Sequence, residues 1–155
     1  MRRAGGGGLS GRLSSKPTQY LLDASNFARR FPGGSGFSPD LAEAEFLGWV
    51  EELAALPLLA ASSFRVYFDG PFRELRGHHA EWCPRCPVSV TFNEGRSADE
   101  SLLETGEFLL SCGVRAVLVT SDRGLQSAAG ARGVSWLSCE EFYRLCSSEL
   151  GRGRR

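Results

Sequence analysis

Tyr20-Leu21-Leu22-Asp23 is a short apolar run that ends in an aspartate, and two later runs repeat the arrangement. These are Phe64-Arg65-Val66-Tyr67-Phe68-Asp69 and Ala116-Val117-Leu118-Val119-Thr120-Ser121-Asp122. Because ligands of an open parallel sheet bind beyond the carboxyl ends of its strands, acids placed there converge on one crevice. A further acidic pair, Asp99-Glu100, opens an expected helix. The pattern predicts a site for a divalent cation.

Short apolar runs alternate with helical patterns through most of the chain, which predicts an α/β domain with a parallel sheet between helices. Strands are expected at 19–23, 64–69, 88–92, 115–120 and 134–137. Helices are expected at 39–56, 98–111, 123–129 and 139–149. The second and fourth helices begin at serine-x-x-glutamate capping boxes, Ser97 to Glu100 and Ser138 to Glu141.

The 155 residues fit one domain, with 42% hydrophobic and 23% charged residues. Residues 1–18 contain four consecutive glycines and little apolar surface, so we expect a flexible N-terminal arm. We place the folded domain at 19–149 and a basic C-terminal tail at 150–155.

Charge and composition exclude several classes of protein. The 18 basic residues, all but one of them arginines, balance 18 acidic ones, so any nucleic-acid site is a local patch. No stretch approaches the roughly 20 apolar residues of a membrane helix, and the first 16 residues lack the apolar middle of a signal peptide. We therefore expect a cytoplasmic protein. Five cysteines with only one close pair do not form a disulfide scaffold.

Each acid also has a structural explanation. Asp99 and Glu100 suit the positive end of a helix, Asp122 suits a helix cap, and Asp23 suits a turn. Asp69 precedes glycine and proline, a common turn signal, so it is a second-tier ligand. Four coincident placements favour a shared site over four separate accidents.

A family resemblance rests on these same segments. Asp23-Ala24-Ser25-Asn26 resembles the aspartate-x-x-asparagine motif of NYN domains, a branch of the PIN-like nucleases. The blocks Phe68-Asp69, Ser97-Ala98-Asp99-Glu100-Ser101 and Val119-Thr120-Ser121-Asp122-Arg123-Gly124-Leu125-Gln126 are similar, in order and spacing, to those of the bacterial YacP-like NYN group. The resemblance covers residues 19–146. Ala24 and Ser25 stand where the group usually has a glycine and an aromatic residue.

The resemblance implies a PIN-like domain with strand order 3-2-1-4-5 that acts as a metal-dependent endoribonuclease. Its Mg²⁺ or Mn²⁺ would be held by Asp23, Asp99 and Asp122, with Glu100 as a fourth acid and Asn26 beside them. Hydrolysis would leave a 5′-phosphate and a 3′-hydroxyl. The alternative is a non-catalytic RNA- or ribosome-binding module of the same fold. In either case the expected partner is single-stranded RNA, with the ribosome as a further one.

Substrate contacts are expected beside the acids. Asn26, in the turn after the first strand, would hold a carboxylate or a phosphate, or is an ordinary turn residue. Three arginines in loops or helix starts are candidates to bind flanking phosphates: Arg123, Arg96 and Arg29. Arg123, beside Asp122, is the preferred one, and for the other two an ordinary solvated surface charge is the alternative. Phe27, Phe72 or Trp82 would stack on an unpaired base, although core packing is the simpler explanation for any one of them.

A separate segment carries metal-ligand residue types. His78, His79, Cys83 and Cys86 lie within nine residues, a spacing that suits part of a structural zinc site. A redox dithiol and an unliganded surface loop are the alternatives. None of these belongs to the family pattern.

Overall fold

The structure, a computed structural model, describes residues 13–30, 39–72, 87–95 and 97–153. Of residues 28–30 and 39–42 it describes the backbone only. The strands are β1 (Gln19–Asp23), β2 (Ser63–Asp69), β3 (Val88–Asn93), β4 (Ala116–Val119) and β5 (Ser135–Leu137). The helices are α1 (Ala24–Arg30), α2 (Pro39–Ala54), the 3₁₀ turn η1 (Pro57–Leu59), α3 (Ala98–Ser111), α4 (Arg123–Ala131) and α5 (Cys139–Gly153). Every expected strand is confirmed to within two residues at each end.

The five strands form one sheet in the order β3-β2-β1-β4-β5, and all neighbours are parallel. This confirms the expected α/β class and the expected strand order. The chain builds one half of the sheet from β1 towards β3, and then returns to the other side of β1 with β4. The direction of winding therefore reverses between β1 and β4, which is where ligands bind in sheets of this type.

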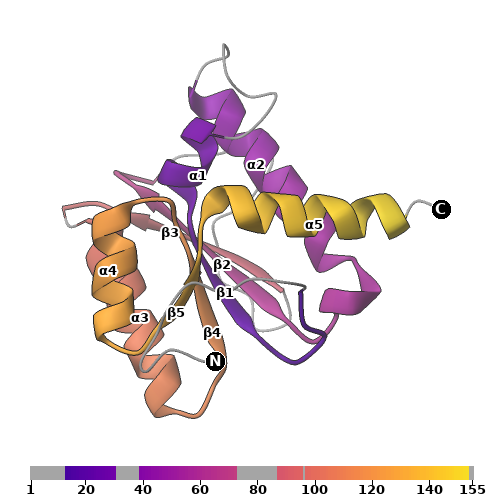
Figure 1. Cartoon of the computed structure of the whole chain (residues 1–155). Coiled ribbons are helices and arrows are strands. Elements are labelled where there is room, and N and C mark those ends of the chain that lie inside the picture. The colour runs from indigo at the N-terminus through magenta and orange to yellow at the C-terminus, as the bar shows by residue number, and fades with distance from the viewer. Residues whose placement is uncertain (1–12, 31–38, 73–86, 96, 154–155) are drawn as a thin grey trace.

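Helices cover both faces of the sheet, giving three layers (Figure 1). Alternate residues of β1 point to opposite faces. Tyr20 and Leu22 pack in the core beneath α1, α2 and α5, whereas Leu21 packs in the core beneath α3 and α4. No helix among the described residues has the length and apolarity to cross a membrane.

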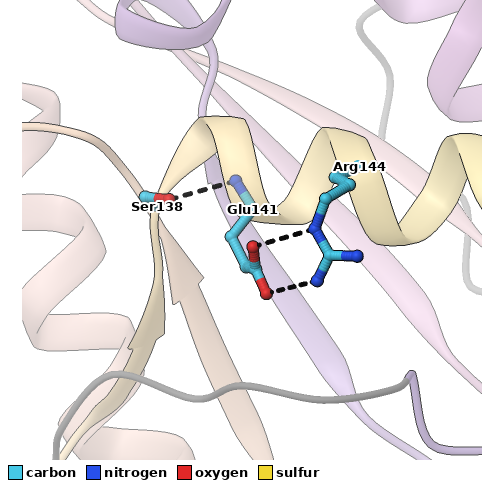
Figure 2. Close-up of polar contacts among 3 residues, drawn as sticks. All are labelled: Ser138, Glu141 and Arg144. Atoms are coloured by element: carbon cyan, nitrogen blue, oxygen red, sulfur yellow. Dashed lines mark hydrogen bonds and ion pairs between the residues drawn. The ribbon is translucent and has the colours of Figure 1, made fainter.

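Helix α5 begins at the expected capping serine. The Oγ of Ser138 accepts a hydrogen bond from the backbone N–H of Glu141 at 3.0 Å, and the Glu141 carboxylate then pairs with Arg144 (Figure 2). The same serine capping occurs at α3, where the Oγ of Ser97 accepts from the N–H of Glu100. Helix α5 continues to Gly153, four residues beyond its expected end.

The segment after β1 is a helix, so the expectation of a turn at Asn26 was wrong. Helix α1 has only seven residues and depends on tertiary packing, because isolated helices this short are unstable. Phe27 supplies that packing: it is buried, with its ring centroid 4.7 Å from that of Phe46 and 5.6 Å from that of Trp49. Phe27 is therefore a core residue, not one that stacks on a base.

Part of the expected N-terminal arm contacts the domain. Leu13 packs against the core, and Thr18 is buried. The backbone N–H of Thr18 donates to the Oγ of Ser62 at 3.2 Å. The rest of the expected arm, residues 1–12, and residues 154–155 of the expected tail lie outside the described residues.

Candidate active site

Four aspartates lie at or just beyond the carboxyl ends of strands. Asp23 is the last residue of β1 and Asp69 the last of β2. Asp122 caps α4 three residues after the end of β4, and Asp99 is the second residue of α3, which follows β3. Because the sheet is parallel, these positions share one edge of the domain.

Asp23 is buried, with 4% of its surface exposed, at the junction of β1 and β4. Its Oδ2 accepts a hydrogen bond from the Oγ1 of Thr120 at 2.7 Å, and its carboxylate also accepts from the backbone N–H of Asn26. The pKa of Asp23 is nevertheless raised to about 6, first by burial and then by the charges of Asp99 and Asp69. At neutral pH this carboxylate is ionised in most molecules.

The pKa of Asp99 is raised as well, first by partial burial and then by the charges of Asp122 and Asp69. Repulsion of this kind operates between carboxylates only over short distances. Asp99 therefore lies near enough to Asp122 and Asp69, and Asp23 near enough to Asp99 and Asp69, for their charges to act on one another. Asp69, the second-tier ligand, is thus among them.

Asp122 has a capping role and a place in the cluster at the same time. Its Oδ1 accepts from the N–H of Leu125 at 2.9 Å, which caps α4, while its own N–H donates to the Oγ1 of Thr120. A Cβ at position 124 would lie 3.2 Å from the Oδ1 of Asp122, so Gly124 leaves room for the carboxylate.

Asn26 links α1 to the segment after β4. Its Oδ1 accepts from the backbone N–H of Ser121 at 3.0 Å and lies 3.5 Å from the Sγ of Cys139. Burial raises the pKa of Cys139 to about 12, so the sulfur is a thiol that can donate. The Asn26 side chain thus connects α1 to Ser121, the residue before Asp122, and to the first residue of α5.

The remaining predicted residues are placed as follows. Glu100 is exposed on the first turn of α3, and Arg123 is exposed on the first turn of α4 beside Asp122. Arg29 belongs to α1, where only its backbone is described. Outside the described residues lie Arg96, Trp82 and the predicted zinc ligands His78, His79, Cys83 and Cys86.

Sequence reasoning missed two residues that organise the site. Thr120 bonds both Asp23 and the backbone of Asp122, and Ser25 accepts from the backbone N–H of Asp69 at 2.9 Å. The sequence feature that could have identified Thr120 is its position: it is a hydroxyl residue that directly follows a wholly apolar strand. Ser25 carried no comparable signal, because its partner is 44 positions away.

The acidic cluster offers carboxylate oxygens as the donors for a cation. Among the described residues, no three histidine, cysteine, aspartate or glutamate side chains lie close enough together to hold a metal ion directly. Magnesium commonly keeps several waters and takes only one or two carboxylates from the protein. In the described part of the chain, no arginine or lysine forms an ion pair with Asp23, Asp99 or Asp122. Carboxylate oxygens without a basic partner are the donor type that a hydrated magnesium ion takes.

The chain forms a five-stranded parallel sheet in the order β3-β2-β1-β4-β5, with helices on both faces and acids at its carboxyl edge. The chain matches two crystal structures of Rae1 (YacP) from Bacillus subtilis. One is the W164L mutant, with 21% identity over 88% of this chain and 79% of that chain at a TM-score of 0.67. The other has 20% identity over 88% and 77%, at a TM-score of 0.69.

At this level of identity the likeness establishes the fold alone, and in that respect the expected resemblance to YacP-like NYN domains is confirmed. No protein-family model and no curated protein sequence matches the chain.

Proposed function

We propose that this chain is a metal-dependent endoribonuclease that hydrolyses RNA at the acidic cluster with Mg²⁺ or Mn²⁺. The observation that carries the proposal is the position of Asp23, Asp99 and Asp122 at one edge of the sheet, where the charge of Asp99 acts on Asp23 and the charge of Asp122 acts on Asp99. Such a cluster would repel a phosphate backbone unless a cation accompanied it. A shared fold with Rae1 (YacP) agrees with a PIN-like nuclease.

The proposed role of each residue follows from its position in the cluster. Asp23, Asp99 and Asp122 would hold the ion, and Glu100 is the nearest further acid along the chain. When bound, the ion stabilises charge on the phosphate oxygens and activates water. Thr120 and Asn26 orient Asp23 through hydrogen bonds. The products would be a 5′-phosphate and a 3′-hydroxyl.

RNA contacts flank the cluster. Arg123 is exposed next to Asp122, where its guanidinium can bind a neighbouring phosphate. Arg96 and Arg29 remain predicted phosphate ligands. Phe72, three residues after Asp69, is 65% exposed, and its ring packs edge-on at 5.6 Å against Phe92. An exposed ring with one supported edge suits stacking on an unpaired base, so the substrate is single-stranded RNA.

A cytoplasmic location, presentation of RNA by the ribosome and zinc at the His78–Cys86 segment remain predictions. The alternative function is a non-catalytic RNA- or ribosome-binding module. One observation favours that alternative: among the described residues no three acids form a direct metal-binding group.

A cleavage assay separates the two functions. Purified protein is incubated with internally labelled single-stranded RNA and Mn²⁺, beside the Asp122→Asn variant, whose asparagine still caps α4. The matched control is Glu107→Gln, which changes an exposed acid paired with Arg132. We expect cleavage by wild type and Glu107→Gln only. Equal cleavage by Asp122→Asn would remove the assigned site, and RNA binding without cleavage by any protein would favour the binding module.

A further inference from the structure

Asp69 joins the two backbone segments that carry Asp23 and Asp99. Its backbone N–H donates to the Oγ of Ser25 at 2.9 Å, and its Oδ1 accepts from the backbone N–H of Ala98 at 3.1 Å. Ser25 lies two residues after Asp23, and Ala98 lies immediately before Asp99. A single residue at the end of β2 therefore connects the start of α1 to the start of α3.

The carboxylate of Asp69 completes the N-terminus of α3. The first N–H groups of a helix have no partner within the helix. Ser97 accepts from the N–H of Glu100, and Asp69 accepts from the N–H of Ala98, the first helical residue. Asp99, the next residue, is placed by this contact.

The main chain holds Asp69 in register for this contact. Gly70 has a φ of 91°, which lets the chain turn directly after the strand. Its N–H donates to the carbonyl oxygen of Asn93 at the end of β3. The position of the Asp69 side chain thus follows from β2, β3 and the start of α1 together.

We propose that Asp69 is a positioning residue that holds Asp99 in place against Asp23, and that its acceptor oxygen, not its charge, serves the site. The inference rests on the proposed nuclease function, and it replaces the sequence-based prediction of Asp69 as a second-tier metal ligand. Asp69 lies on β2, one strand away from the switch point between β1 and β4, where Asp23 and Asp122 stand. A metal ligand must supply charge, whereas a positioning residue needs only the Oδ1 that accepts from Ala98.

Two substitutions at one position separate these roles. Asp69→Asn keeps an acceptor oxygen and removes the charge, whereas Asp69→Ala removes both. We expect Asp69→Asn to retain kcat within about threefold of wild type, because the contact to Ala98 survives. We expect Asp69→Ala to lower kcat by at least about tenfold with KM unchanged, because displacement of a catalytic group by about 1 Å can lower rates up to 100-fold.

Ser25→Ala removes the other end of the connection and leaves the carboxylate in place. We expect a loss of kcat between those of the two Asp69 variants. Should Asp69→Ala fail to fold, as judged by circular dichroism, Ser25→Ala and Asp69→Asn carry the test. An Asp69→Asn protein that folds and is as inactive as a ligand variant such as Asp99→Asn would overturn the proposal, as would full activity of Ser25→Ala.

Amide hydrogen exchange tests the positioning role without RNA or metal. The Ala98 amide should exchange faster in Asp69→Ala than in wild type, and Asp69→Asn should restore most of the protection. Unchanged exchange in Asp69→Ala would overturn the proposal even if wild type cleaves RNA. If wild type cleaves nothing, the proposed nuclease function fails, and the exchange data still decide whether Asp69 holds the start of α3.

Discussion

Thr120 donates its hydroxyl proton to the Oδ2 of Asp23 at 2.7 Å, across the junction of β4 and β1 and between residues 97 positions apart. The same Oγ1 accepts from the backbone N–H of Asp122 at 3.1 Å. One buried hydroxyl therefore sets the relative position of two of the proposed metal ligands.

Replacement of Thr120 by valine should shift the pH dependence of the proposed RNA cleavage. Valine keeps the shape and removes the hydrogen bond that lowers the pKa of Asp23, so that pKa rises above about 6. If cleavage requires ionised Asp23, the acid limb of the kcat profile moves to higher pH. Unfolding in urea should show a loss of about 1–3 kcal/mol from the unpaired carboxylate oxygen. Thr120→Ser, which keeps the hydroxyl, is the control, and an identical profile for valine and threonine would contradict the prediction.

The raised pKa of Asp23 predicts how stability depends on pH. A folded-state pKa of about 6, against 3.8 for an unperturbed aspartate, means that the folded state binds this proton more tightly than the unfolded state. Its contribution to stability is present below pH 3.8 and is lost as the pH rises to about 6. The shift corresponds to about 3 kcal/mol. The unfolding free energy of wild type relative to Asp23→Asn should fall by that order between pH 4 and 7, and a flat difference would contradict the assigned burial and repulsion.

Divalent cations should stabilise the folded protein at neutral pH. Mn²⁺ or Mg²⁺ relieves the repulsion around Asp99, and a ligand that binds only the folded state raises the melting temperature. We expect a concentration-dependent increase in wild type, measured by thermal unfolding, that is reduced in Asp99→Asn. Glu107→Gln, at the other end of α3, should respond as wild type does. An equal increase in Asp99→Asn would mean that the ions bind elsewhere.

Two substitutions at Asp122 should separate its structural role from its proposed chemical role. Asparagine also caps helices well, so Asp122→Asn should keep the stability of wild type, whereas Asp122→Ala should lose about 1 kcal/mol. Both variants should lose RNA cleavage. Denaturant unfolding and the cleavage assay, applied to both variants, check this. If Asp122→Asn cleaves RNA as wild type does and only the less stable Asp122→Ala loses cleavage, Asp122 acts as a helix cap alone.

The exposed ring of Phe72 predicts a contribution to RNA binding. Loss of a base-stacking contact costs about 1–3 kcal/mol, so Phe72→Ala should raise the Kd for a single-stranded oligonucleotide about 5- to 160-fold. Phe72→Trp should retain binding. Phe108→Ala is the matched control, because the Phe108 ring is equally exposed, at 66%, and lies near the C-terminal end of α3, whereas Asp99 lies in its first turn. The Asp122→Asn background prevents cleavage during an anisotropy titration, and equal affinities for both alanine variants would remove the stacking role.

Local pattern predicted the architecture because buried parallel strands must be apolar and helix starts must satisfy their N–H groups. The strands and both capping serines needed no information from distant residues. Helix α1 escaped prediction because seven residues carry too little periodicity, and Phe27 stabilises it through contacts with α2. The sequence places Asp69 only second among the predicted metal ligands because Asp69-Gly70-Pro71 is typical of a turn. The chain does turn there, as the φ of Gly70 shows.

What the sequence by itself determined is the set of strands, their polar ends and hence the edge of the sheet at which the acids lie. Only the tertiary structure decided which carboxylates influence one another and what each one holds. The reason is distance along the chain: the bonds of Asp23 to Thr120, of Asn26 to Ser121 and of Asp69 to Ala98 join residues 97, 95 and 29 positions apart. No local pattern encodes those contacts, because they exist only once the strands are side by side.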